Sequence, residues 1–302
     1  MVKSDNPNPN HSHDDPARCD PAELGDAGEI IDRALAEDLA SGDVTSRVAV
    51  PAEAMARARL VTKAPLVLSG LPVAAAVFHR VDPSTWIELV ACDGERVPEG
   101  TIVARVRGRA RSLLAAERTA LNLLQRMSGV ATLTRRFVDA VGGRCRITDT
   151  RKTMPGLRSL DRYAVRCGGG HNHRNDLGAG ILIKENHIRA AGGIMAAITA
   201  AKERAPHTLR IECEVTDMKE LSEALDAGAD VVMLDNMDDA AVAEAVTITS
   251  GRALVEVSGG ISCERVEALA TLGIDLISVG KLTHSAAAAD ISLLFEPPGG
   301  WH

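Results

Sequence analysis

The sequence has few aromatic residues, since Phe, Tyr and Trp together make up 2% of its 302 positions. Proteins that bind single-stranded nucleic acid stack bases on aromatic side chains and follow the backbone with a basic surface. This chain lacks both features, because its formal net charge is −7 at pH 7. We therefore expect no nucleic acid among its partners.

Long apolar runs are also missing. No stretch approaches the roughly 20 residues that a membrane-spanning helix needs, so we expect no membrane partner. The first residues contain no apolar segment of the kind found in secretory signals. Asn, Pro, His and Asp dominate this region, and we expect a disordered leader over residues 1–24.

The cysteines show no pairing pattern. None has CxxC spacing, and no histidine cluster accompanies them at the spacing of a zinc site. In a chain of this length, isolated cysteines indicate free thiols in a reducing cytoplasm. They are Cys19, Cys92, Cys145, Cys167, Cys213 and Cys263.

What the chain does contain is apolar content of 45%, enough for a sizeable core in one or two domains. Helical spacing of apolar residues predicts a helix over residues 29–39, and a second helix is expected at residues 72–81. Short segments rich in Val, Leu and Ile surround the second helix. We therefore expect a strand-rich α/β sandwich domain over residues 25–128. The helical region that follows, residues 112–141, is expected to divide into two helices at Gly129.

From residue 129 onward, six short apolar segments alternate with helical patterns. This alternation predicts parallel βαβ units around a buried sheet. The spacing is that of an open, incomplete α/β barrel, which we expect over residues 129–290, followed by a C-terminal tail at residues 291–302. The predicted strands are RCRITDT, ILIK, RIECEV, VVMLDN, LVEVSGG and LISVG.

Polar residues gather at the carboxyl ends of these strands. In a barrel all such ends meet at one rim, where active sites lie. Exposure of loops explains some polar strand ends, but it explains less well why charges recur just inside buried strands, where an unpaired charge is costly. The residues concerned are Asp149, Thr150, Arg151, Lys152, Lys184, Glu212, Glu214, Asp235, Asn236, Glu256, Ser258, Gly259, Gly260, Ser278, Val279 and Gly280.

The chemistry of this rim indicates anionic ligands. Arginine grips a carboxylate or phosphate with two parallel hydrogen bonds, and lysine supplies a compact positive charge. Glu214 and Asp235 could hold Mg²⁺, which prefers oxygen ligands, or could pair with the cations. The glycine-bearing strand ends VSGGI and SVGKLTHS suit a phosphate. His171 and His173 have no third metal ligand nearby in the sequence, so His173 either positions a substrate or is structural.

These motifs resemble the quinolinate phosphoribosyltransferase family, also called carboxylating nicotinate-nucleotide pyrophosphorylase. The most specific segment runs from TDTRKTMPGLRSLDRYAVRCGGGHNHR to LIKENHI, and IECEV, MLDNM, VEVSGGI and SVGKLTHS follow in the family's order. Earlier in the chain, ALAEDLASGDVTS and AERTALNLLQRMSGVAT also match. Met154 stands where the family pattern has Thr, and Glu185 where Asp is commoner.

The resemblance implies a reaction in which quinolinate and phosphoribosyl pyrophosphate become nicotinate mononucleotide, pyrophosphate and CO2, with Mg²⁺ as cofactor. It also implies a seven-stranded open barrel and a homodimer. Arg118 would enter the site from the neighbouring subunit. Quinolinate would be held by Arg151, Lys152, His173, Arg174 and Lys184, and Thr150 would also bind substrate. Glu214 and Asp235 would serve the ribose and the Mg²⁺–pyrophosphate end, and Ser258–Gly260 with Ser278–Gly280 would cradle the 5′-phosphate. Lys152, Lys184, Glu214 and Asp235 are the residues expected to be catalytic.

Three other functions fit parts of the pattern. A related phosphoribosyltransferase would act on another pyridine carboxylate without decarboxylation. A barrel aldolase would use Lys184 as a Schiff-base amine. A binding protein would keep the fold without catalysis, although the charged rim argues against it.

Overall fold

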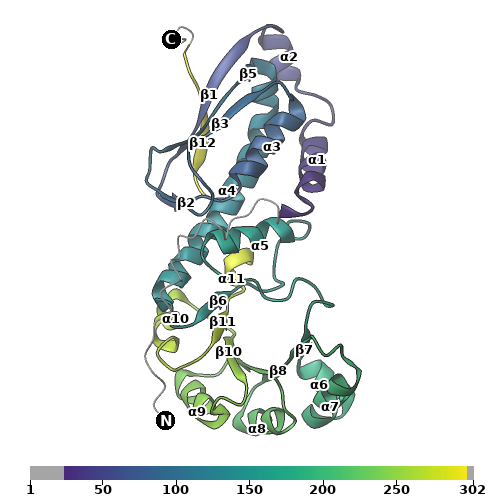
Figure 1. Cartoon of the computed structure of the whole chain (residues 1–302). Helices are drawn as coiled ribbons and strands as arrows, with labels where there is room; N and C mark the ends of the chain where they lie inside the picture. The colour runs from purple at the N-terminus through teal and green to yellow at the C-terminus, as the bar shows by residue number, and fades with distance from the viewer. Residues whose placement is uncertain (1–23, 298–302) are drawn as a thin grey trace. The chain divides into compact units, whose positions relative to one another are not determined.

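The computed structural model describes residues 24–297 (Figure 1). The chain divides into two compact units, each assembled from separate stretches of sequence. The first contains residues up to 135, 154–169 and the segment from 285 onward, and the second contains residues 136–153 and 170–284. The predicted leader lies outside the described residues except for Leu24. None of the helices described is long and apolar enough to cross a membrane.

The first unit is built on an antiparallel sheet with strand order β12-β1-β5-β3. Residues of β5 alternate between buried Ala104 and Val106 and exposed Arg105 and Arg107, because successive side chains of a strand point to opposite faces. The elements of this unit are α1 (Ala27–Asp38), α2 (Val44–Ala49), β1 (Met55–Thr62), β2 (Leu66–Val67), α3 (Leu71–Val81), β3 (Trp86–Leu89), β4 (Arg96–Val97), β5 (Ile102–Arg109), α5 (Arg158–Cys167) and β12 (Ile291–Phe295). The expected strand-rich domain is confirmed.

Strand β12 was not predicted, since its residues were assigned to a C-terminal tail. The register pairs Leu60 of β1 with Leu293 of β12, more than two hundred positions later in the sequence. A five-residue segment gives too weak a periodic signal to reveal such a distant partner. Buried Ile291 and Leu293 anchor the strand in the sheet.

The prediction that Gly129 separates two helices is wrong, because α4 (Ala110–Val141) is one helix of 32 residues. A single interior glycine costs about 1 kcal/mol relative to alanine, which the burial of Leu124, Met127 and Val130 along the same helix outweighs. Gly129 serves close packing instead. A Cβ added there would lie only 3.0 Å from the carbonyl carbon of Ala287.

A buried ion pair joins two helices of the first unit. Arg126 of α4 donates from Nε and Nη2 to the two carboxylate oxygens of Asp161, at 3.0 and 2.9 Å. The Asp161 side chain is fully buried, and its second oxygen also accepts from the amide of Met154. The carboxylate is thereby satisfied at each oxygen, as a buried charge requires.

The second unit contains a parallel sheet with strand order β6-β11-β10-β9-β8-β7. All six predicted strands are confirmed, and helices lie between most of them. The elements are β6 (Arg146–Thr148), β7 (Ile181–Ile183), α6 (Glu185–Ala191), α7 (Ile194–Arg204), β8 (Ile211–Val215), α8 (Met218–Asp226), β9 (Val231–Asp235), α9 (Asp239–Thr249), β10 (Leu254–Ser258), α10 (Cys263–Leu269), β11 (Leu276–Ser278) and α11 (Lys281–His284).

The barrel is incomplete beside β6. His171 forms an isolated parallel bridge with Thr148, in which its amide donates to Ile147 and its carbonyl accepts from Asp149. This bridge is one residue long, and the described sheet has six strands where the resemblance implied seven. Among the described residues no strand pairs with β7 on its free side, so the sheet is open there.

Alternation along β8 sorts side chains between the two faces of this sheet. Ile211, Cys213 and Val215 are buried on one face, against which α8 packs. Glu212 and Glu214 fall between them and therefore point to the other face, into the barrel. The same alternation sends Glu256 of β10 inward, since Val255 and Val257 on either side are buried.

Candidate active site

The carboxyl ends of the parallel strands bring most of the predicted site residues to one edge of the second unit. Asp235 at the end of β9 pairs in register with Ser258 at the end of β10. Ser278 at the end of β11 pairs with Thr148 at the end of β6. Because the strands run in the same direction, the residues that follow them emerge on the same side. These are Thr150, Arg151, Lys152, Lys184, Asp235, Gly259, Gly260, Val279 and Gly280.

Lys184 is positioned by the junction between β7 and α6. It precedes the first helical residue, and its backbone amide donates to Nδ1 of His187 at 3.0 Å. Its ammonium group donates to the carboxylate of Glu214, and the two side chains are 45% and 14% exposed. This is the pairing of rim carboxylate with rim cation that the charge pattern predicted.

Asp149 organises the segment GGGHNHR. Its side chain is fully buried, and one oxygen accepts from Nδ2 of Asn172 while the other accepts from the backbone amide of His173, both at 2.7 Å. The strand-end carboxylate therefore fixes where the loop carrying His173 and Arg174 runs. Sequence reasoning noted Asp149 but gave it no function.

His173 lies against two buried carboxylates inside the barrel. Its Nε2 is 3.3 Å from Glu212 and 3.6 Å from Glu256. Burial lowers the pKa of His173, but hydrogen bonds to the two glutamates and their charges outweigh burial and raise the pKa to about 10. Burial away from water raises the pKa of Glu212 in turn. The imidazole and the two carboxylates thus form one buried cluster of ionisable groups.

The backbone orients the imidazole ring. The amide of Arg174 lies 2.8 Å from Nδ1 of His173 and donates to this nitrogen in the neutral ring, while Nε2 faces the carboxylates. Sequence reasoning recognised Glu212 and Glu256 as charges in buried strands but did not connect them with His173. The inward-facing positions of β8 and β10 are the signal that connects them.

Two guanidinium groups crowd the same region. Arg174 donates from Nη1 to the carbonyl of Gly180 at 2.9 Å. Burial, followed by the positive charge of Arg151, lowers the pKa of Arg174. Cations held together in this way are stabilised by an anion placed between them.

Glycines at two strand ends allow close backbone approach. A Cβ added at Gly280 would lie 3.1 Å from Cδ of Lys152. Gly259 has a φ of +88°, and an added Cβ would be 2.9 Å from the backbone nitrogen of Asn236. Both positions favour glycine, which leaves backbone amides accessible to a phosphate.

One predicted site residue belongs to the other unit. Arg118 is an exposed residue of α4, within the first unit. The contribution of Arg118 to the site stays a prediction.

The carboxylates at the rim suit a magnesium ion that shares its ligands with a substrate. Glu214 and Asp235 offer oxygen ligands at neighbouring strand ends. Magnesium is usually bound by one or two carboxylates together with substrate phosphates and water. Among the residues described, the group of three whose ligand atoms lie within 4.8 Å of one another is His173, Glu212 and Glu256.

Fold and site together are typical of one class of protein, the barrel enzymes that bind anionic substrates at the carboxyl edge of their sheet. Two family models match the chain. The C-terminal domain of quinolinate phosphoribosyl transferase matches residues 130–294, and its N-terminal domain matches residues 43–128. The chain belongs to the quinolinate phosphoribosyltransferase family.

Individual relatives agree with the family models. The nicotinate-nucleotide pyrophosphorylase [carboxylating] of Mycobacterium leprae is 42% identical over 90% of this chain and 98% of its own length. A probable enzyme of the same name from Bacillus subtilis is 40% identical, covering 88% and 92% of the two chains. The structure of the nicotinate-nucleotide pyrophosphorylase from Francisella tularensis has a TM-score of 0.85 at 38% identity and covers 92% and 98% of the two chains.

Proposed function

We propose that this enzyme transfers the phosphoribosyl group of phosphoribosyl pyrophosphate to the ring nitrogen of quinolinate, with loss of CO2, and so forms nicotinate mononucleotide for NAD biosynthesis. The observation that supports the proposal is the ion pair of Lys184 with Glu214 at the carboxyl edge of the sheet, together with Arg151 and Arg174, whose positive charges act on each other. Quinolinate carries two adjacent carboxylates, and this compact dianion matches the clustered cations.

Each part of the rim has a role in this reaction. Arg151, Lys152, His173, Arg174 and Lys184 bind the two carboxylates and hold the ring nitrogen toward the ribose. Lys184 exchanges part of its contact with Glu214 for the substrate. Thr150 belongs to the same pocket. The glycine-bearing ends at Ser258–Gly260 and Ser278–Gly280 hold the 5′-phosphate with backbone amides.

Substitution at the ribose C1 needs stabilisation of positive charge. The carboxylates of Glu214 and Asp235 favour the oxocarbenium character that C1 gains as pyrophosphate departs. These carboxylates would hold a magnesium ion, which when bound would neutralise charge on the leaving group. The nitrogen of the pyridine ring then forms the bond to C1, and the ring becomes cationic.

Decarboxylation follows from the same charge. The cationic ring accepts the electron pair that remains when the 2-carboxylate leaves as CO2, and C2 then takes up a proton. No side chain acts as a nucleophile, so Lys184 needs no Schiff base. The pairing of Lys184 with Glu214 supports an electrostatic role for this lysine.

The test is an assay of nicotinate mononucleotide and of labelled CO2 from carboxyl-labelled quinolinate, with and without Mg²⁺. Arg151→Ala and Lys184→Ala should each lower kcat/KM by at least about ten- to a hundredfold, the value of one charged hydrogen bond. Arg189→Ala is the matched control, because Arg189 is 72% exposed and pairs with Glu185 outside the pocket. Unchanged kcat/KM in Arg151→Ala or Lys184→Ala would remove that residue from the site.

The alternatives give different results in the same assay. A related phosphoribosyltransferase would form a nucleotide without releasing labelled CO2. An aldolase would be trapped by borohydride with a carbonyl substrate and would ignore phosphoribosyl pyrophosphate. A binding protein would bind quinolinate in calorimetry and form no product.

Assembly and location complete the proposal. A homodimer in which Arg118 reaches the neighbouring site would be detected by mixing Arg118→Ala with Lys184→Ala, since hybrid dimers would regain one intact site. A cytoplasmic location fits the free thiols of the five cysteines that the structure describes.

A further inference from the structure

The antiparallel sheet of the first unit carries rows of arginine on its outer face. The register of β1 and β5 places Arg57 directly opposite Arg107, and Arg59 directly opposite Arg105. Like charges that face each other across an antiparallel pair destabilise the sheet. The face is therefore positively charged in a chain whose formal net charge is −7.

Neighbouring strands supply limited compensation. Glu88 of β3 accepts from Arg105 at 2.8 Å. Glu296, which follows β12, donates its backbone amide to the carbonyl of Arg57, so its side chain belongs to the same face. The four arginines Arg57, Arg59, Arg105 and Arg107 thus meet two glutamates on these strands.

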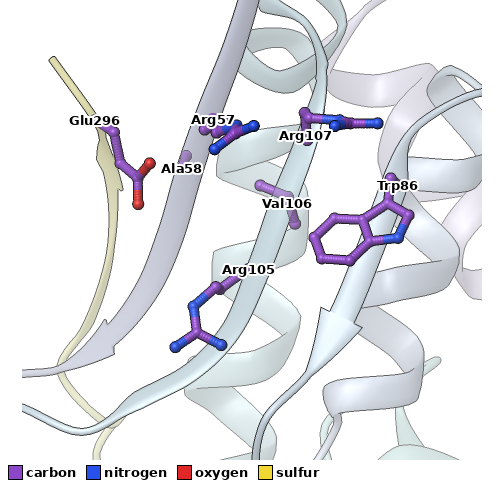
Figure 2. A pocket seen from close by; sticks show the side chains of 7 residues that line it. All are labelled: Arg57, Ala58, Trp86, Arg105, Val106, Arg107 and Glu296. Carbon is purple, nitrogen blue, oxygen red and sulfur yellow. The ribbon is translucent and has the colours of Figure 1, made fainter. Parts of the chain in front are cut away.

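A cavity of about 550 Å³ lies on this face. Figure 2 shows Arg57, Arg105 and Arg107 around its centre over Val106, with Trp86 at one side and Glu296 at the other, and with helices behind the sheet. This volume is within the range of small-ligand sites, about 300–1,000 Å³.

Trp86 gives the cavity a planar apolar wall. The residue is 49% exposed although it is a large aromatic side chain. The guanidinium carbon of Arg107 lies 6.0 Å from the centroid of its ring, at the outer limit of a cation–π contact. Arg107 is therefore within reach both of the indole and of an anion in the cavity.

We propose that this cavity, the sheet-face site, binds a nucleotide whose phosphates lie among Arg57, Arg105 and Arg107 and whose base packs against Trp86. Guanidinium groups match phosphate oxygens in pairs, and an aromatic wall next to them suits a flat ring. A bound polyphosphate offsets the repulsion between the opposed arginines. The proposal concerns a ligand other than the substrates of the proposed reaction.

The sequence offers a direct optical probe. Its two tryptophans are Trp86 and Trp301, so Trp301→Phe leaves Trp86 as the sole tryptophan. ATP added to this variant should change its fluorescence in a saturable way, and adding salt should weaken binding. Inorganic tripolyphosphate should bind without packing on the ring, and adenosine should give no saturable change.

Arginine variants in the Trp301→Phe background locate the site. Arg57→Gln and Arg107→Gln should each raise the Kd for ATP about tenfold or more. Arg252→Gln controls for net charge and should leave the Kd unchanged, because Arg252 is an exposed residue in the turn after α9 that pairs with Asp226. Lys184→Ala controls for binding in the proposed catalytic pocket and should also leave it unchanged. Arg107→Gln should not lower Tm, because it removes a like-charge pair.

Several results would overturn the proposal. One is the absence of a saturable fluorescence change with ATP. Another is a loss of ATP affinity in the two control variants as large as that in Arg107→Gln. Equal affinity for ATP and tripolyphosphate with no fluorescence change would show that the face binds phosphates but that no base packs against Trp86. A change of sedimentation coefficient in Arg107→Gln, with no ATP binding in the parent, would identify the face as a contact between copies of the chain.

Discussion

Gly129→Ala tests the close packing on helix α4. Helix propensity by itself predicts that alanine stabilises this interior position by about 1 kcal/mol. The structure predicts the reverse, because the new Cβ would lie 3.0 Å from the carbonyl carbon of Ala287 and 3.3 Å from Cα of Ala288. Overpacking of this kind costs typically 1–3 kcal/mol.

The segment that would have to move is fixed to the same helix. The amide of Ala289 donates to the carbonyl of Gln125 at 2.9 Å, and Nε2 of Gln125 donates to the carbonyl of Ile291 at 2.7 Å. Each of these hydrogen bonds is worth about 1 kcal/mol. Moving the segment away would lose these bonds, so we place the overpacking cost at the upper end of its range, about 3 kcal/mol. Less the gain of about 1 kcal/mol in helix propensity, the net destabilisation is about 2 kcal/mol.

Urea unfolding followed by circular dichroism measures this loss as a lower midpoint. Ser222→Ala on α8 is the control, because this exposed helical residue becomes alanine and loses only the hydrogen bond from its hydroxyl to the carbonyl of Met218. Its midpoint should stay the same or rise slightly. A Gly129→Ala protein as stable as the parent would show that Ala287 does not lie against the helix.

Three further predictions concern buried groups. Asp161→Asn removes one charge of a buried ion pair and should cost about 3–5 kcal/mol in urea unfolding, and full stability in this variant would contradict the pairing. Cys92 is exposed and should react with a thiol reagent at pH 8 in the native protein. Burial raises the pKa of Cys213 to about 12, so this thiol should react only after unfolding. The carboxylates hold the pKa of folded His173 at about 10, above its ordinary 6.5, so its stabilising contribution is complete below about pH 6.5 and is lost as pH rises toward 10. Glu256→Gln should flatten that loss, and an unaltered pH profile would argue against the cluster.

The strands and helices of the second unit could be predicted well because each βα pair is formed by residues close together in the sequence. Every strand from β7 to β11 is followed within a few residues by a helix, and apolar runs such as VVMLD and LVEVS are bounded by turn residues. Parallel direction then places Lys184 and Asp235 at one edge without knowledge of side-chain contacts. The ion pair of Lys184 with Glu214 agrees with that reasoning.

The features that sequence reasoning missed depend on contacts distant in sequence. The sequence alone suggested that Gly129 breaks the helix. The backbone of Ala287, which can pack there only because residue 129 has no side chain, is far away in the sequence. Strand β12 depends on pairing with β1 in the same way. To predict the contact of His173 with Glu212 and Glu256, one must know which strand residues point into the barrel. The sequence shows this only once the strand register is known.

The pairing of β1 with β12 has a consequence for synthesis on the ribosome. The amino-terminal half emerges first, yet β1 keeps a bare edge of hydrogen-bonding groups until Ile291–Phe295 leaves the exit tunnel. The first unit therefore cannot finish folding before the whole second unit has been translated. A nascent chain halted shortly before residue 291 would present that edge to its neighbours on the same polysome, which makes late termination errors a route to aggregation.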